Sequence, residues 1–169
     1  MAAPTFQLSE TNGASSGTVT DNVPQVAYAS VDSASTSGLS GSNPIAAGNN
    51  SYEKYNRWKL TGVAPNSISA GYVWFNATAP TDSGGSSANL TYKYGVTNTY
   101  TQPVATTSTV ATTNTTTDTA TGTQAFTAPA NTLNAYSQYL VTQLQVGSGA
   151  AGGNCTFQSA AITFGYTWA

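Results

Sequence analysis

The side chains of this sequence that could carry acid–base chemistry are six carboxylates, because histidine is absent. Two carboxylates held at a defined separation can hydrolyse a glycosidic bond. No two acids are close in this sequence, and all but Glu53 fall in segments that we expect to be loops. The acids are Glu10, Asp21, Asp32, Glu53, Asp82 and Asp118. We therefore expect solvated loop acids and no catalytic pair.

Nucleophilic and metal-dependent sites also lack their usual residues. Ser-His-Asp and Cys-His arrangements need a histidine, and the commonest zinc and non-haem iron sites lose their main ligand without one. No dense run of aspartates of the calcium-binding kind is present. Cys155 is the single cysteine, so an intrachain disulfide is impossible and we expect a small, partly buried thiol. The sequence predicts no enzymatic activity, no metal and no cofactor.

One segment, GSGAAG at residues 147–152, matches the G-x-G-x-x-G pattern of dinucleotide-binding proteins. In those proteins the glycines open a helix, and an acidic residue follows about 20 residues later. Here the segment that follows looks extended, and no acid comes after it. We interpret these residues as a hairpin loop.

The composition predicts one all-β domain without a nucleic-acid site. Thr and Ser dominate the polar residues, and β-branched Thr suits a strand better than a helix. Only 6% of the 169 residues are charged, and the net charge is −2. The clustered Lys and Arg that neutralise phosphates are therefore missing.

The first residues have neither the basic nor the apolar region of a signal peptide. No run reaches the roughly 20 apolar residues that a membrane helix requires. We expect no membrane partner, and a subunit that is made in a cytoplasm and released as a soluble protein.

Alternating apolar and polar residues predict most of the strands. The expected strands cover residues 52–60, 69–77, 88–96, 124–127, 139–146 and 160–168, with an extended strand at 23–31. Residues 104–115 are expected as one long Thr-rich strand or as a strand and its turn. Leu133, Tyr136 and Leu140 have helical spacing, which leaves a single helical turn open at this point. The set predicts an antiparallel β-sandwich of the Ig-like or jelly-roll type.

The chain is expected to consist of an extended N-terminal part and a folded domain. Residues 1–50 read as an extended N-terminal arm and loop with one or two short strands, and residues 51–169 as the β-sandwich domain. Phe6 and Leu8 alternate with polar neighbours and could add an edge strand to this or a neighbouring subunit.

Three of the four basic residues lie in the strand at 52–60. Its alternation turns Trp58 and Leu60 inward and leaves Tyr55, Arg57 and Lys59 on the opposite, charged face. This face has two interpretations. It is either a solvated edge that discourages aggregation, or a docking patch in which Arg57 and Lys59 meet carboxylates of a partner and Tyr55 adds interface area.

The aromatic residues allow a second kind of partner. A row of exposed rings on a sheet can stack on sugars, whereas rings at alternating strand positions more commonly pack in a core. A carbohydrate-binding or adhesion module is therefore an alternative function.

Four segments of the sequence are informative together: EKYNRWKLTG at residues 53–62, AGYVWFNA at 70–77, QPVATTSTVATT at 102–113 and YSQYLVTQLQV at 136–146. In these segments the chain resembles virion structural proteins of tailed bacteriophages. The proteins that the chain resembles are β-sandwich subunits encoded near the head genes.

The resemblance implies a non-enzymatic capsid decoration or minor head protein, or a tail component, located in the virion. Its implied partners are the major capsid protein or other virion proteins, and association between copies of the chain stays open. The surface residues that we assign to partner binding are Phe6, Leu8, Tyr55, Arg57 and Lys59.

Overall fold

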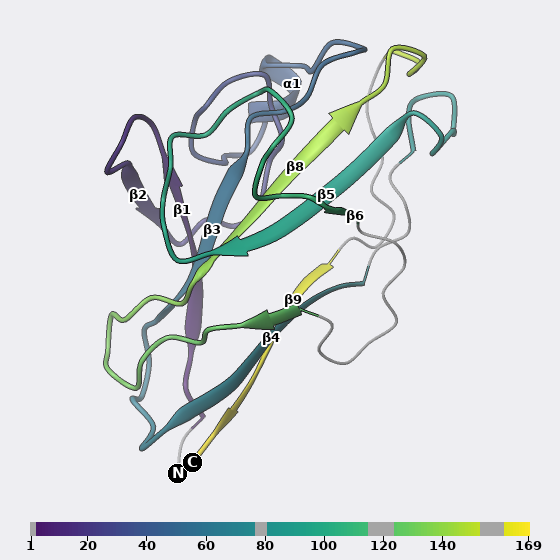
Figure 1. Ribbon diagram of the computed structural model, residues 1–169. Coiled ribbons are helices and arrows are strands. Elements are labelled where there is room, and N and C mark those ends of the chain that lie inside the picture. The colour runs from purple at the N-terminus through teal and green to yellow at the C-terminus, as the bar shows by residue number, and fades with distance from the viewer. Residues whose placement is uncertain (1–2, 77–80, 115–123, 153–160) are drawn as a thin grey trace.

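The regular secondary structure of the protein is almost entirely antiparallel strands, which form two sheets joined by long loops (Figure 1). The computed structural model describes residues 3–76, 81–114, 124–152 and 161–169. The large sheet has the order β2-β1-β3-β8-β5-β6. Its strands are β1 (Phe6–Asn12), β2 (Thr18–Asp21), β3 (Lys54–Leu60), β5 (Leu90–Thr97), β6 (Thr113–Asn114) and β8 (Tyr139–Val146).

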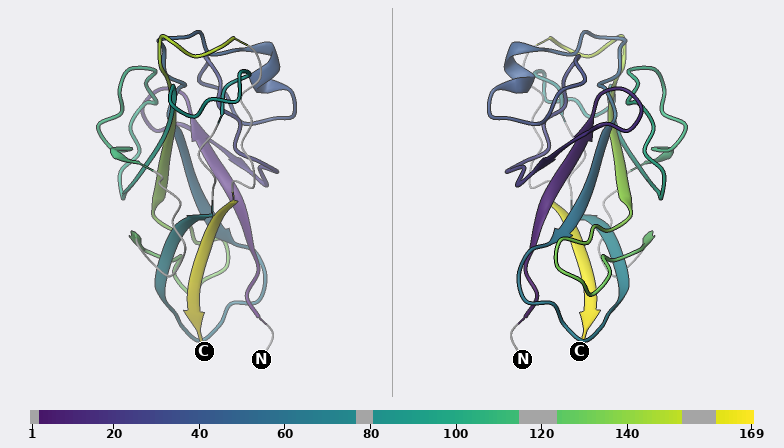
Figure 2. Two further views of the ribbon diagram at one scale, coloured as in Figure 1. Left: turned by 90° about the vertical axis from the view of Figure 1, so that its right-hand side faces the viewer. Right: turned by 90° about the vertical axis from the view of Figure 1, so that its left-hand side faces the viewer.

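The small sheet has the order β7-β4-β9 and lies at the end of the molecule that carries the C-terminus and the start of the described chain (Figure 1). Its strands are β4 (Ile68–Asn76), β7 (Gln124–Phe126) and β9 (Ala161–Trp168), and the one short helix in the described residues is α1 (Leu39–Ser42). The C-terminus lies at the far end of the small sheet, beside the start of the described chain (Figure 2). There the Tyr166 hydroxyl donates a hydrogen bond to the Pro4 carbonyl over 3.4 Å.

The two sheets share one aromatic core. Trp58 of β3 stacks on Phe164 of β9 with ring centroids 4.9 Å apart, and its ring meets the edge of Phe126 of β7 at 5.5 Å. Tyr92 and Leu140 of the large sheet and Val73 of the small sheet are buried in the same cluster. Trp58 of β3 and Leu140 of β8 therefore face the small sheet.

The opposite face of the large sheet is also covered, by the loop that follows β5. Tyr55 and Val141 are fully buried there, and they pack with Tyr139, Ala111 and Tyr100. Burial on both faces explains why β8 reads YLVTQLQV, in which apolar residues point both ways.

The structure confirms the all-β prediction, but two of the expected strands are wrong. Residues 23–31 form no strand, and of residues 104–114 only Thr113–Asn114 is a strand. In both segments the alternating small apolar residues pack a loop onto the large sheet: Ala27, Ala29 and Ala111 are buried. The helical turn considered near Leu133 is also absent from the described chain, which has only turns and bends there.

Side chains satisfy the backbone of these covering loops. The buried Gln143 amide donates to the carbonyls of Thr106 and Ser51, over 2.7 and 3.1 Å, and accepts from the Ser108 backbone N–H over 3.0 Å. Buried backbone polar groups need such partners, and a side chain that provides them removes the need for a neighbouring strand.

The first strand of the chain, β1, lies inside the large sheet with a neighbouring strand on each side. β1 pairs with β2 on one side and with β3 on the other, from Phe6 opposite Leu60 to Thr11 opposite Tyr55. Residues 6–12 are thus not a free arm, because both of their edges are used over most of their length.

One glycine of β5 sets how closely the covering loop approaches the sheet. A Cβ added to Gly95 would overlap the backbone carbonyl of Val110. We expect Gly95→Ala to lower the free energy of unfolding by about 2 kcal/mol, because neither backbone can yield easily. Gly41→Ala is the matched control, since a Cβ there meets no atom within 4 Å. Urea denaturation measures both, and equal midpoints would contradict the close approach.

Candidate functional site

The charged side chains of this protein are mostly engaged within the chain. Of the ten charged residues, eight have an ion pair, hydrogen bond or cation–π contact to another part of the chain. They are Glu10, Asp21, Asp32, Glu53, Lys54, Arg57, Lys59 and Asp82. Lys93 is half-buried on β5, and Asp118 lies outside the described residues.

Glu10 of β1 and Lys54 of β3 form an ion pair of 3.0 Å in which both side chains are fully buried. The Lys54 ammonium also donates to the Ser33 carbonyl over 2.7 Å. Glu10 accepts further hydrogen bonds from the Ser35 hydroxyl, at 2.5 Å, and from the Asn56 amide, at 3.5 Å. The pair therefore ties the loop at residues 33–35 to two strands of the large sheet.

Sequence reasoning missed this cluster, although a signal for it was present. Glu10 continues the alternation of Phe6 and Leu8, and Lys54 shares the face of Trp58 and Leu60. A charged residue that continues an apolar alternation on two strands can mark a buried pair. Glu10 was instead expected in a loop, and that expectation is wrong because it lies in β1.

The exposed part of the large sheet's outer face carries the outer patch, which we define as Asp21, Arg57, Lys59, Tyr136 and Tyr139. The Arg57 guanidinium carbon lies 3.9 Å from the ring centroid of Tyr136 and 4.6 Å from that of Tyr139. Cations over aromatic faces are attracted to the ring quadrupole. The two rings therefore hold the guanidinium in place on the sheet.

Lys59 and Asp21 form the second ion pair of the described chain, with 2.5 Å between the Lys59 Nζ and the Asp21 Oδ2. Burial would raise the pKa of Asp21, but hydrogen bonds from Lys59, Ser9 and Tyr136 outweigh it and hold that pKa below its ordinary value. The same hydrogen bond raises the pKa of Lys59. Both groups stay charged at neutral pH.

Arg57 differs from Lys59 in forming no ion pair within the described residues. In the described part of the chain, the two ion pairs belong to Lys54 and Lys59. The Arg57 charge is thus held by rings and not neutralised by a carboxylate. A half-buried guanidinium held in position in this way can donate hydrogen bonds to a carboxylate from outside the chain.

The structure agrees with part of the predicted site and corrects the rest. Trp58 and Leu60 point to the core, and Arg57 and Lys59 lie on the opposite face, as expected. The edge interpretation of this strand is wrong, because β3 lies between β1 and β8. Tyr55 is 0% exposed and bonds to the Thr101 hydroxyl, so the expectation that it offers interface area is wrong too.

Phe6 and Leu8 also point inward. The Phe6 ring lies 4.7 Å from that of Tyr166 and 5.5 Å from that of Phe164. Leu8 sits opposite Trp58 in the sheet, and its carbonyl accepts a hydrogen bond from Val23 over 2.9 Å. Phe6 thus serves the contact between the sheets, and Leu8 lies on the same face of β1. Arg57 and Lys59 are the members of the predicted set that lie on the outer face.

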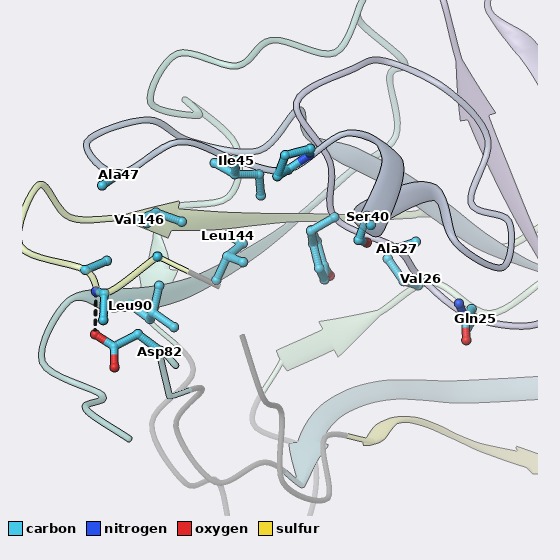
Figure 3. Close-up of a pocket in the computed structure, with 16 residues that line it drawn as sticks. Gln25, Val26, Ala27, Ser40, Ile45, Ala47, Asp82, Leu90, Leu144 and Val146 are labelled. Atoms are coloured by element: carbon cyan, nitrogen blue, oxygen red, sulfur yellow. Dashed lines mark hydrogen bonds between the residues drawn. The ribbon is translucent and has the colours of Figure 1, made fainter. Parts of the chain in front are cut away.

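A cavity of about 640 Å³ lies between the loop at residues 25–47 and the ends of β5 and β8 (Figure 3). Its walls are mainly apolar, with Leu90, Leu144 and Val146 on one side and Ile45 on the other. Asp82 is the one acid among the lining residues. Its carboxylate accepts backbone hydrogen bonds from Ala151, Ser86 and Gly84, which lower its pKa. It therefore works as a loop anchor.

Tyr28 also lines this cavity, and it is bonded into the sheet. Its hydroxyl forms hydrogen bonds with the hydroxyls of Tyr92 and Thr142, the latter over 2.8 Å. Burial raises the pKa of Tyr28, and it raises that of Tyr92 to about 12. Both phenols therefore stay protonated at neutral pH, and they hold the loop against the sheet.

The described residues contain no group of three or more His, Cys, Asp or Glu side chains that could hold a metal ion. Within the same ranges, no helix has the length and apolar character needed to cross a bilayer. Cys155 and the segment after GSGAAG lie in residues 153–160, which are outside the described residues, so their predicted conformations stay predictions.

The buried ion pair makes a direct prediction about stability. Lys54→Met leaves the Glu10 carboxylate buried without its cation and should lower the free energy of unfolding by about 3–5 kcal/mol. Adding Glu10→Leu to that variant should recover most of the loss, because two apolar side chains need no partners. Lys93→Met is the control and should change stability by less than about 0.5 kcal/mol. Urea denaturation of the four proteins would contradict the structure if Lys54→Met matched the control.

Comparison with known proteins does not place the chain in a family. No family model, no curated protein sequence and no solved structure matches it.

Proposed function

We propose that this protein is a non-enzymatic structural subunit of a tailed-phage virion, which decorates or stabilises the capsid through contacts with the lattice. The observation that supports this best is the use of its charged groups. Those with acid–base capacity are bound to the chain's own strands and loops, as at Glu10, Lys54, Asp82 and Asp21. The exposed surface that remains is rich in uncharged Ser, Thr, Gly and Asn residues, which suits a coat component better than an active site.

The fold is compatible with this role. As part of the proposal, we regard the two sheets as a β-sandwich of the Ig-like or jelly-roll type, which is a common architecture of viral coat proteins. The residues ahead of β1 would act as the arm, in place of the longer arm expected from the sequence. The protein would be made in the host cytoplasm and then join the virion.

The outer patch is the proposed docking surface for the major capsid protein or another virion protein. Arg57 offers a positioned charge without an acid of its own, and the two tyrosine rings reduce the entropy lost when a partner carboxylate binds. Arginine and tyrosine are also the residue types that carry much of the energy of protein interfaces. Lys59 would contribute less, because Asp21 already neutralises it.

Copurification tests the proposal. The chain should remain with intact particles through gradient purification, and Arg57→Glu with Lys59→Glu should reduce the copies per particle about tenfold or more. Lys93→Glu on β5 is a control for charge reversal away from the patch and should leave occupancy unchanged. Far-UV circular dichroism verifies that both variants fold. Quantitative mass spectrometry of the particles gives the copy number, and a low number would indicate a tail component instead of a decoration protein.

A groove on the small sheet favours a second function, the binding of glycans. Tyr72 is 40% exposed there. The groove beside it is lined by Ser69, Gly71, Thr127 and Gln138 and has a volume of about 550 Å³. An exposed ring next to hydroxyl and amide groups is an arrangement that can stack on a sugar and hydrogen-bond to it.

Glycan arrays test this alternative. The isolated chain should bind at least one glycan class, and Tyr72→Ala should weaken that binding about tenfold, because the stacking surface is lost. Leu133→Ala removes a comparably exposed apolar side chain that does not line the groove, and it should have no effect. Silence across the arrays would argue against the glycan-binding function and leave the structural role as the better account.

A further inference from the structure

The four outer strands of the two sheets differ in how well their free edges are protected. Natural proteins shield an edge by keeping it short or by placing charges or proline on it. β2 has four residues and carries the ion-paired Asp21, β6 has two residues, and β7 has three. β9 has eight residues, AITFGYTW, without a charge or a proline. Within the described chain, β9 pairs only with β4.

Hydrogen bonds at the end of β9 show which backbone groups face away from β4. Ala169 and Ser67 exchange both backbone hydrogen bonds, at 3.3 and 3.2 Å. In an antiparallel pair such residues alternate along the strand with residues whose N–H and C=O point the other way. The shift in register between Ser69 and Tyr72 adds one extra residue to β4, so the alternation continues along β9. Residues 164, 166 and 168 therefore direct their backbone groups to the open edge.

This edge is complementary to a second copy of itself. When two β9 strands run antiparallel about a twofold axis at Gly165, residue 164 lies opposite 166 and residue 162 lies opposite 168. Every one of these positions directs its N–H and C=O outward, so the two edges match donor to acceptor without a shift. The backbone geometry thus permits an antiparallel pair centred on Gly165.

The side chains favour the same pairing. Phe164 and Tyr166 lie on one face of β9 with ring centroids 5.3 Å apart, and the pairing sets Phe164 of each copy opposite Tyr166 of the other. Cross-strand aromatic pairs stabilise antiparallel sheets. Trp168 is still 38% exposed and would gain burial at the end of the joined strands. No like charges meet along the seam, because β9 has none.

We propose that this protein forms a homodimer in which β9 of one copy pairs antiparallel with β9 of the second, joining two small sheets into one of six strands. The proposal concerns the association of the free chain and does not rest on the proposed function. It uses a surface other than the outer patch, so a decorated particle could engage both.

Sedimentation and hydrogen exchange test the dimer. A chain of 17.2 kDa should sediment at twice that mass as its concentration rises. Amide exchange followed by NMR should show protection of residues 164, 166 and 168 that increases with concentration. Residues 165 and 167, which face β4, should be protected at every concentration. A single 17.2 kDa species up to about 1 mM, or a dimer in which the even-numbered amides stay unprotected, would overturn the proposal.

Two substitutions at one position separate backbone pairing from side-chain contact. Trp168→Pro removes an outward-facing N–H while leaving the hydrogen bonds to β4, and it should raise the dimer dissociation constant about tenfold or more. Trp168→Leu keeps the N–H and an apolar side chain and should raise it less. Thr18→Lys, on the edge strand β2, is the control and should have no effect. Equal effects of the two Trp168 variants, or none from either, would contradict strand pairing. Circular dichroism verifies the fold of each variant.

Discussion

The buried ion pair of Glu10 and Lys54 is the interaction on which the packing of β1, β3 and the loop at residues 33–35 depends. Two charges removed from water are costly unless they are paired and their remaining hydrogen-bonding groups are satisfied. Here the partners come from β1, from β3 and from the loop at residues 33–35. The pair is therefore complete only when all three are in place. This requirement couples a long loop, which has little regular structure of its own, to the register of two neighbouring strands.

The same principle recurs wherever a loop covers the large sheet. Gln143 binds the backbone of the loop after β5, Asp82 binds that of its own turn and of Ala151, and Tyr28 joins Tyr92 and Thr142. In each case a buried polar side chain supplies the hydrogen bonds that a neighbouring strand would otherwise provide. Within the described residues, much of both faces of a six-stranded sheet is thus covered although the second sheet has three strands.

This use of polar groups also shapes the surface that is left for function. When most charges are committed to internal contacts, the exposed surface is neutral, and recognition depends on the few groups that stay accessible. Arg57, held between two tyrosine rings without an acid of its own, is the clearest of these. The uncharged edge of β9 is a second accessible feature. There the exposed polar groups belong to the backbone and not to side chains. A docking surface and a self-association surface can therefore coexist on opposite sheets.

The sequence by itself determined the all-β class, most of the strands with their inward and outward faces, and the lack of histidine-based chemistry. These follow from local information, because alternation reports which side of a strand is buried. Only the tertiary structure decided that Glu10 and Lys54 meet, that Tyr55 lies beneath a loop, and that residues 23–31 and 104–112 are covering loops. Such features depend on contacts between residues far apart in the chain. A small apolar residue that packs a loop onto a sheet leaves the same pattern in the sequence as one that lies in a strand.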